Sequence, residues 1–313
     1  MNKSYTDIEI KTKAIYVEQH KSYYNDSTIF NRHLAAAQDL ATYDLPENFF
    51  KGKSVLDAGC GNSGYFQLAM FNLGAKKVTC LDIGEEWKPE LSKILLQKKI
   101  PDGFCEFISG STTRMPFKDE SFDFVASNGV LMHLETIEMA DEAIAELSRV
   151  AKKGGVVYSH IGVDKPGIVD RYIVKALRSA YQEDEEFRSF IDTINPKLIN
   201  SAILEFFNKC SKYDPRLAEI PEDLLDSLIT LDSTTFWQNM LQVPIQQGPK
   251  LSEQWGMKTM SKHGLENIRR PAGTYWIRND FRRYLAPIHF SLDSSLARLF
   301  YGNGHVKLIA DKP

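Results

Sequence analysis

The sequence is poor in cysteine and carries no strong net charge, and both features narrow what the chain can be. Its four cysteines are Cys60, Cys80, Cys105 and Cys210, and they form no CxxC pair and no spacing typical of metal ligands. We therefore expect reduced thiols, no metal site and a reducing, cytoplasmic compartment. Lys and Arg total 38 against 41 Asp and Glu, a net charge of −3. This balance gives no general attraction to nucleic acid or to an anionic membrane, although it leaves a local basic patch open.

Long apolar segments are lacking as well. The N-terminal stretch MNKSYTDIEIKTK is polar and has no apolar signal-peptide core, and no uncharged apolar run is long enough to cross a bilayer. Hydrophobic residues still make up 43% of the 313 residues, an ordinary fraction for a protein with a real core. We expect a soluble protein without a membrane partner, built as one α/β domain with insertions.

Short apolar runs alternate with amphipathic stretches from Lys53 onward. This spacing predicts βαβ units, and therefore a Rossmann-like, doubly wound, mostly parallel sheet that binds ligands at the carboxyl ends of its strands. The predicted strands are 54–59, 77–84, 104–110, 121–128 and 154–162, and the predicted helices between them are 64–75, 89–99 and 136–151.

Four segments follow from where this alternation starts, stops and resumes. The chain is predicted to have an N-terminal helical lid segment at 1–50, the α/β core at 51–163, a helical cap insertion for the acceptor at 164–250, and a C-terminal completion of the core at 251–313. That completion contains a helix ending at Gly264, the strand LENIRR and the last strand HVKLIAD. A second insertion at 271–303 separates the two strands.

The most informative stretch joins the first strand to the first helix. Gly59, Gly61 and Gly64 form a GxGxxG, and Asp82 ends the next strand. The glycines permit a tight turn and a close approach of backbone to a ligand, and Asp82 is placed to accept hydrogen bonds from ribose hydroxyls. By spacing alone this loop could equally bind NAD, or be a turn without a ligand.

Asp57 favours a different nucleoside cofactor. It lies two residues before the first glycine, at the carboxyl end of the strand, where a fixed carboxylate would repel a pyrophosphate. S-adenosylmethionine (SAM) carries no phosphate, and its sulfonium and α-amino groups are both positive. A nearby carboxylate therefore favours SAM over NAD.

The stretch DAGCGNSG, followed by LDIG, FDFVASNGVLMHL and the strand at 154–160, resembles the class I SAM-dependent methyltransferases. The resemblance covers residues 53–162 and, more faintly, 251–313. It implies a small-molecule methyltransferase with a seven-stranded sheet whose last strand is antiparallel, with SAM as cofactor and S-adenosylhomocysteine as product. By motif position, the implied cofactor contacts are Asp57, Gly59, Gly61, Gly64 and Asn128 for the methionine part, Asp82 for the ribose and Ile83 for the adenine.

The sequence departs from this family at the adenine site. The family commonly has an acid after the third strand that contacts the adenine amino group, and here GSTTRMPF places Ser111 in that position. A serine hydroxyl can still accept that hydrogen bond. We therefore expect Ser111 and Thr112 as adenine contacts, with an unrelated turn as the alternative.

Methyl transfer from a sulfonium is an in-line displacement that depends above all on alignment, and a hydroxyl or ammonium acceptor also needs a base. His133, just after the fourth strand, resembles the histidine that phosphoethanolamine-type methyltransferases pair with an N-terminal tyrosine. His133 with Tyr23 or Tyr24 is thus the candidate catalytic pair, and packing is the alternative for His133. His160, which ends the fifth strand, is a weaker candidate. Tyr23, Tyr24 and Arg32 are also candidates for a lid over SAM, with an exposed amphipathic helix as the alternative.

The sequence favours a small polar metabolite as acceptor, methylated at N, O or S, because a cap could close a pocket over the methyl group. The alternative is an RNA-modifying enzyme, since SNGVLMH also resembles tRNA wobble-uridine modification enzymes and arginines alternate with aromatics over 269–284. A non-catalytic SAM-binding protein is a third class. The sequence shows neither the Asn/Asp-Pro-Pro-Tyr pattern of DNA amino-methylation nor a cysteine placed for cytosine-C5 chemistry, and it leaves a homodimer open.

Overall fold

A computed structural model of the chain describes residues 27–163, 179–193, 209–213, 251–271 and 305–313, together with the single positions 10, 176, 205 and 215. The chain divides into two compact units. The first consists of 1–165, 245–276 and 303–313, and the second of 166–244 and 277–302.

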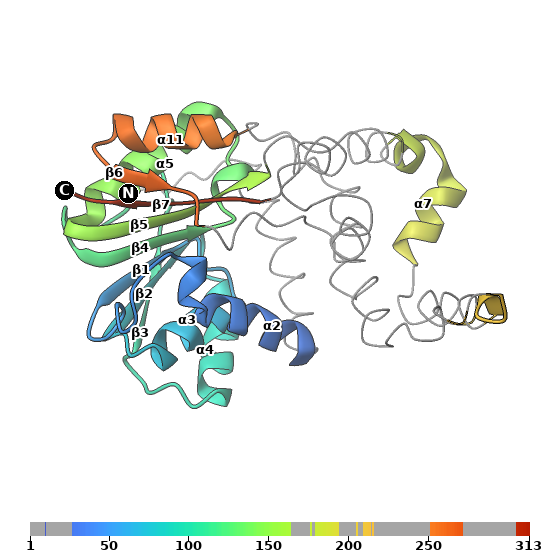
Figure 1. The fold of residues 1–313 in the computed structure, drawn as a ribbon, viewed down its shortest axis with the longest axis horizontal. Helices are drawn as coiled ribbons and strands as arrows, with labels where there is room; N and C mark the ends of the chain where they lie inside the picture. Colours follow the sequence, from blue (N-terminus) through green and yellow to red (C-terminus); the bar gives the residue numbers. More distant parts are fainter. Residues whose placement is uncertain are drawn as a thin grey trace. The chain divides into compact units, whose positions relative to one another are not determined.

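A seven-stranded sheet lies at the centre of the first unit (Figure 1), in the order β3-β2-β1-β4-β5-β7-β6. Strands β1 to β5 pair in parallel, and β7 is antiparallel to both β5 and β6. The predicted seven-stranded, mostly parallel sheet with an antiparallel last strand is thus confirmed. The strands are β1 (Ser54–Ala58), β2 (Lys77–Asp82), β3 (Cys105–Ser109), β4 (Phe122–Asn128), β5 (Ala151–Val163), β6 (Glu266–Arg269) and β7 (His305–Asp311).

Helices cover both faces of this sheet (Figure 1). One face carries α2 (Ser27–Gln38), α3 (Tyr65–Asn72) and α4 (Trp87–Gln97), and the other carries α5 (Ile137–Val150) and α11 (Glu253–Lys262). Two short 3-10 helices, η1 (Leu40–Thr42) and η2 (Leu131–His133), complete the unit. Each face has its own apolar core, because successive side chains of a strand point to opposite faces. Val55 of β1 belongs to the core under α3, and its neighbour Leu56 to the core under α5.

Local sequence explains where the helices begin and end. Thr136 caps α5, since its hydroxyl accepts a hydrogen bond from the Met139 N–H at 3.2 Å. Ser252 caps α11 in the same way, through the Trp255 N–H at 3.1 Å. Gly264 follows the end of α11 with a φ of 75°, a conformation that glycine adopts without strain. The predicted helix at 136–151 and the predicted helix end at Gly264 therefore agree with the structure.

The connection between β3 and β4, residues 110–121, contains no α-helix, although crossovers in such sheets are usually helical. Two side chains of α5 hold it in place. The Glu146 carboxylate accepts a hydrogen bond from the Met115 N–H at 2.6 Å, and the Arg149 guanidinium donates to the Phe117 carbonyl at 2.8 Å. The loop that carries Ser111 and Thr112 is thus anchored to α5.

The described part of the second unit includes helix α7 (Glu185–Asp192), which begins after Asp184. The Asp184 carboxylate accepts a hydrogen bond from the Phe187 N–H at 2.9 Å, an N-terminal cap. Most of the predicted cap at 164–250 and of the second insertion at 271–303 lies outside the described residues. Within the described segments, no helix is both long and apolar enough to cross a membrane.

Candidate functional site

The turn between β1 and α3 places the glycines at the carboxyl end of the sheet, beside the point where the strand order reverses between β1 and β4. Gly59, Gly61 and Gly64 have φ values of 87°, 54° and 75°, which L side chains rarely adopt. Gly59 also lacks room for a side chain, because a Cβ there would lie 2.1 Å from Cγ2 of Val130. The turn therefore needs glycine on two grounds, and the sheet of an open α/β fold binds ligands at this edge.

Helix α3 starts directly from this turn. Its N-cap is Gly64, which has no side chain to satisfy the first backbone N–H groups of the helix. These groups and the helix dipole favour a negatively charged group at the helix N-terminus. The turn can thus receive a ligand carboxylate.

Asp57 supplies a buried carboxyl group behind the turn. Its side chain is only 4% exposed, and its Oδ2 accepts a hydrogen bond from Nε2 of Gln67 at 2.7 Å. Burial raises the pKa of Asp57 to about 7, the Gln67 hydrogen bond opposes this rise, and the charge of Asp82 adds to it. A cation bound beside Asp57 would hold it in the ionised form.

Asp82, at the end of β2, is fixed by the glycine turn itself. Its Oδ2 accepts a hydrogen bond from the Gly61 N–H and its Oδ1 from the Ile83 N–H, both at 2.7 Å. Each carboxylate oxygen retains a further lone pair that can accept from a hydroxyl. Since β1 and β2 are paired in register, Asp57 and Asp82 lie at the same edge of the sheet.

The end of β4 and the part of β5 paired with it bring further polar residues to this edge. Asn128 donates a hydrogen bond from Nδ2 to the Tyr65 hydroxyl at 3.3 Å, and the Tyr65 ring stacks on His33 of α2 with centroids 5.2 Å apart. Asn128 and His160 are register partners in the sheet. Asn128, Tyr65 and His160 therefore gather beside the glycine turn, and α2 contacts the site through His33.

Ser111 and Thr112 lie in the loop after β3. The Ser111 hydroxyl lies 2.9 Å from the Thr113 hydroxyl and accepts a hydrogen bond from the Thr113 N–H at 3.2 Å, while Thr112 is buried. The Ser111 oxygen thus already takes part in a local turn. The structure adds a carboxylate near this loop, because Ser109, at the end of β3, donates a hydrogen bond to Glu85.

His133 ends η2, directly after β4, and is half-buried. Burial lowers the pKa of its imidazole to about 4, so the ring is neutral at pH 7. Tyr23 and Tyr24 lie outside the described residues, and the side chain of Arg32 is not described either. The pairing of His133 with a tyrosine, and the lid, therefore stay predictions.

Two polar residues of α3, Tyr65 and Gln67, did not figure in the sequence analysis. Gln67 shares the buried face of α3 with Phe66, Ala69 and Met70. A signal was present, because an amide at an otherwise apolar position of a helix that follows a glycine turn needs a buried partner. The sequence does not tell which partner that is.

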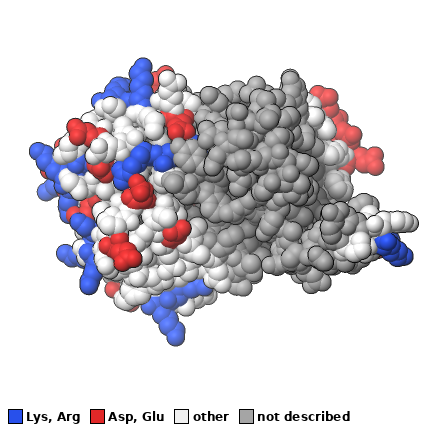
Figure 2. Space-filling model, viewed as in Figure 1, with Lys and Arg blue, Asp and Glu red and all other residues white. Residues whose placement is uncertain are grey.

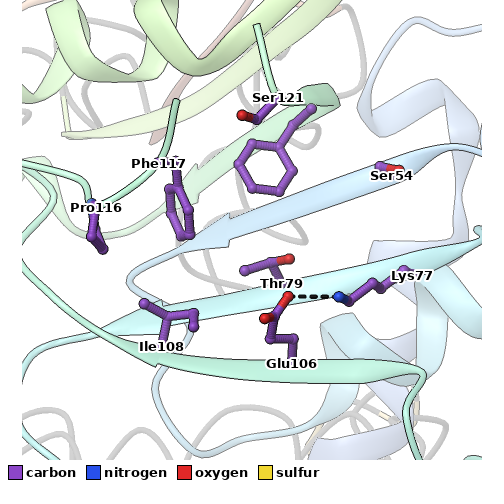
Figure 3. A pocket seen from close by; sticks show the side chains of 9 residues that line it. Ser54, Lys77, Thr79, Glu106, Ile108, Pro116, Phe117 and Ser121 are labelled. Carbon is purple, nitrogen blue, oxygen red and sulfur yellow. Dashed lines mark hydrogen bonds and ion pairs between the residues drawn. The ribbon is translucent and has the colours of Figure 1, made fainter. Parts of the chain in front are cut away.

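A separate hollow of about 490 Å³ is lined by residues of strands β1 to β4 and of the β3–β4 connection (Figure 3). Its lining includes Ser54 and Lys77, which begin β1 and β2, so it lies at the amino ends of the strands. Two of its lining residues, Lys77 and Glu106, form an ion pair 2.6 Å long. The hollow is therefore at the opposite edge from the glycine turn and is no part of the candidate site.

Comparison with known proteins agrees with this geometry. Residues 56–159 match the family described as "Methyltransferase domain". The chain is 34% identical over 111 residues to tRNA (carboxymethyluridine(34)-5-O)-methyltransferase of Arabidopsis thaliana. The aligned segment covers 36% of this chain and 24% of the relative. The chain is 26% identical over 198 residues to 24-methylenesterol C-methyltransferase 2 of the same plant, 62% of this chain and 52% of the relative. The chain thus spans at most about half the length of these two relatives.

A similar fold occurs in a solved complex between the Haloferax volcanii Trm112 methyltransferase activator and its partner chain. The match has a TM-score of 0.50 and 13% sequence identity, and it covers 98% of each chain. At this identity the likeness concerns the fold alone.

Proposed function

We propose that this chain, whose residues 56–159 match a methyltransferase domain, is a class I SAM-dependent methyltransferase that transfers a methyl group from SAM to N, O or S of a small polar metabolite. The observation that carries the proposal is the pair of carboxylates, Asp57 and Asp82, on neighbouring strands around the glycine turn. A pyrophosphate would meet the Asp57 carboxylate here, whereas SAM brings an ammonium and a sulfonium group, and Asp82 can accept hydrogen bonds from a ribose in either cofactor.

The described residues fit SAM in charge and in hydrogen-bonding capacity. In the proposed arrangement, Asp57 faces the α-amino group, the N-terminus of α3 faces the α-carboxylate, and Asp82 accepts hydrogen bonds from the ribose hydroxyls. The remaining proposed contacts are Gly59, Gly61 and Gly64 beneath the methionine part, Ile83, Ser111 and Thr112 around the adenine, and Asn128 beside the methyl group.

The proposed mechanism depends on alignment more than on proton transfer. SAM supplies an electrophilic methyl carbon, and the protein has to hold the acceptor lone pair in line with it. Asn128, oriented by the Tyr65 hydroxyl, and the candidate residue His133 line this edge of the sheet. A histidine whose pKa is about 4 is a weak base, so an acceptor with a neutral lone pair at pH 7 fits the site better than an ammonium group. In this scheme His133 orients the acceptor, together with Tyr23 or Tyr24.

Charge distribution supports a small acceptor over RNA. Arg269 forms an ion pair with Asp44 at 2.7 Å, and the buried Arg270 forms one with Glu253 at 2.8 Å. These two arginines of the 269–284 stretch are thus occupied within the chain. On the described surface of the first unit that Figure 2 shows, basic and acidic side chains are intermingled, and this view shows no broad positive patch for phosphates.

A tRNA-modifying enzyme is the second candidate function. It is favoured by the likeness to the Arabidopsis thaliana tRNA methyltransferase, which reaches 34% identity. That likeness spans 111 residues, a segment about as long as the methyltransferase domain alone, and so does not extend the inference to the acceptor. The sterol relative, with an unrelated acceptor, matches this chain over a longer segment.

Replacement of Asp82 by Ala tests the proposed cofactor site. We expect the variant to bind SAM about 100-fold more weakly or worse, because the fixed carboxylate would no longer accept hydrogen bonds from the two ribose hydroxyls. Transfer of a tritium-labelled methyl group from SAM to a metabolite extract should disappear with it. Isothermal titration calorimetry and the radiolabel assay measure the two effects. Unchanged SAM affinity in Asp82→Ala would contradict the assignment.

A further inference from the structure

A fully buried amide lies behind the Asp57 carboxyl group. Gln67, in the first turn of α3, is 0% exposed, and its Nε2 lies 2.7 Å from Asp57 Oδ2 and 3.5 Å from the Cys80 sulfur. Its neighbours on the buried face of the helix are apolar. A buried amide costs free energy unless it forms hydrogen bonds, and an apolar residue would fill this place at lower cost. The contact with Asp57 therefore calls for a functional reason.

The orientation of this amide distinguishes the two protonation states of Asp57. The N–H side of Gln67 faces the carboxyl group, while its Oε1 is buried and has no hydrogen-bond partner among the described residues. An ionised carboxylate only accepts hydrogen bonds and accepts them more strongly than a protonated carboxyl group, which could also donate to an amide oxygen. With its N–H directed at Asp57, Gln67 stabilises the ionised form of the carboxyl group. The same orientation leaves the Gln67 Oε1 without a hydrogen bond among the described residues.

We infer that Gln67 is a positioning residue that keeps Asp57 ionised and directs its carboxylate toward the α-amino group of SAM. This inference rests on the proposed function, because it concerns the same cofactor site. Gln67 itself lies behind Asp57 and touches no part of SAM in this arrangement.

Among the groups that surround Asp57, Gln67 is the one that favours the ionised carboxylate. Burial raises the pKa of Asp57, the charge of Asp82 on β2 raises it further, and the Gln67 hydrogen bond lowers it. The other titratable groups whose charges interact with Asp57 are uncharged or negative at every pH of interest. They are Cys60 in the glycine turn, Cys80 on β2, Cys105 on β3 and Tyr43 after η1.

The experiment is to titrate wild-type protein and Gln67→Leu with S-adenosylhomocysteine by calorimetry between pH 6 and pH 9. This probe retains the α-amino group, and its own titration is common to all variants. We expect Gln67→Leu to bind about tenfold more weakly at pH 7, because a hydrogen bond to a charged group is lost. The midpoint of the pH dependence should move up by about one unit, and the difference should shrink toward pH 9 as Asp57 ionises in both proteins.

Ser148→Ala is the matched control. Ser148 is buried on α5 and donates a hydrogen bond to the His263 carbonyl at 2.7 Å, away from the glycine turn. Its removal should lower thermal stability without moving the midpoint of binding. If Gln67→Leu does not fold, Gln67→Asn keeps an amide but shortens its reach, and a smaller upward shift is expected.

The outcomes separate the two levels of inference. If the wild-type protein does not bind S-adenosylhomocysteine, the proposed function fails. If the wild-type protein binds it and the Gln67 variants keep the wild-type midpoint, the inference about Gln67 is overturned, whether their affinity is unchanged or uniformly weaker at every pH. Only a shifted midpoint with recovery at high pH supports it.

Discussion

Asp57 is a carboxyl group shielded from water, and its protonation connects binding to stability. Its pKa rises from 3.8 to about 7 on folding, chiefly because of burial. The folded protein therefore holds this proton more tightly than the unfolded chain does. The resulting stabilisation is fully present below about pH 4 and is lost as the pH rises through 7, and it amounts to roughly 4 kcal/mol.

Asp57→Asn should therefore stabilise the protein in the absence of cofactor and abolish its binding. At pH 8 the substitution removes a buried charge, and we expect a melting temperature several degrees higher than that of the wild-type protein. At pH 5 Asp57 is already protonated, so the gain should be small. Thermal unfolding at the two pH values measures this difference. A variant that is less stable than wild type at both pH values would show that the ionised Asp57 carboxylate does not destabilise the folded protein.

At the scale of elements, the glycine turn restricts its sequence in two ways, through its φ values and through the lack of space around Gly59. Gly59 and Gly52 both have positive φ, 87° and 72°, but only Gly59 faces a neighbour, since a Cβ at Gly52 would meet nothing within 4 Å. Gly52→Ala should cost about 1 kcal/mol from backbone strain. Gly59→Ala should cost several kcal/mol, because Val130 blocks the methyl group, and it should also weaken SAM binding. Urea unfolding and calorimetry compare the two variants. Equal costs would mean that the turn adjusts freely and does not depend on the contact with Val130.

The elements were also what the sequence could predict best. Strand β2 spans 77–82 within a predicted 77–84, and α5 spans 137–150 within a predicted 136–151, because cap residues and turns mark their ends locally. Contacts between elements carry no such local mark. The hydrogen bond from Gln67 to Asp57 forms because α3 packs over β1. The hydrogen bonds of Glu146 and Arg149 to the β3–β4 loop form because α5 lies beside that loop. Neither set of contacts could be predicted without the assembled sheet.

The roles proposed for the site residues divide along the same line. The turn glycines, Asp57 and Asp82 could be selected from the sequence, because spacing along two adjacent strands brings them to one edge. The weak basicity of His133 could not be predicted from the sequence, because its low pKa is a consequence of burial in the folded protein. That burial is what moves the proposed mechanism from proton transfer toward alignment.

At the scale of the whole molecule, salt dependence distinguishes the two acceptor classes. Neutralising 6–10 phosphates makes binding weaker by about 10³–10⁵-fold between 50 and 200 mM salt, whereas a buried metabolite pocket has no such dependence. For this chain, with a net charge of −3 and two of its arginines paired internally, we expect methyl transfer to change less than about tenfold over that range. The measurement is transfer from labelled SAM to a metabolite extract and to total tRNA at both salt concentrations. Labelling of tRNA that collapses at high salt would favour the RNA-modifying alternative.

The central claim is that a carboxylate from the first strand meets a positively charged nucleoside over the glycine turn. Calorimetry of the purified chain at pH 8, with S-adenosylhomocysteine in one titration and NAD in another, tests it most directly. We predict saturable binding of S-adenosylhomocysteine that weakens below pH 7, and no binding of NAD. Binding of NAD without binding of S-adenosylhomocysteine would contradict the account.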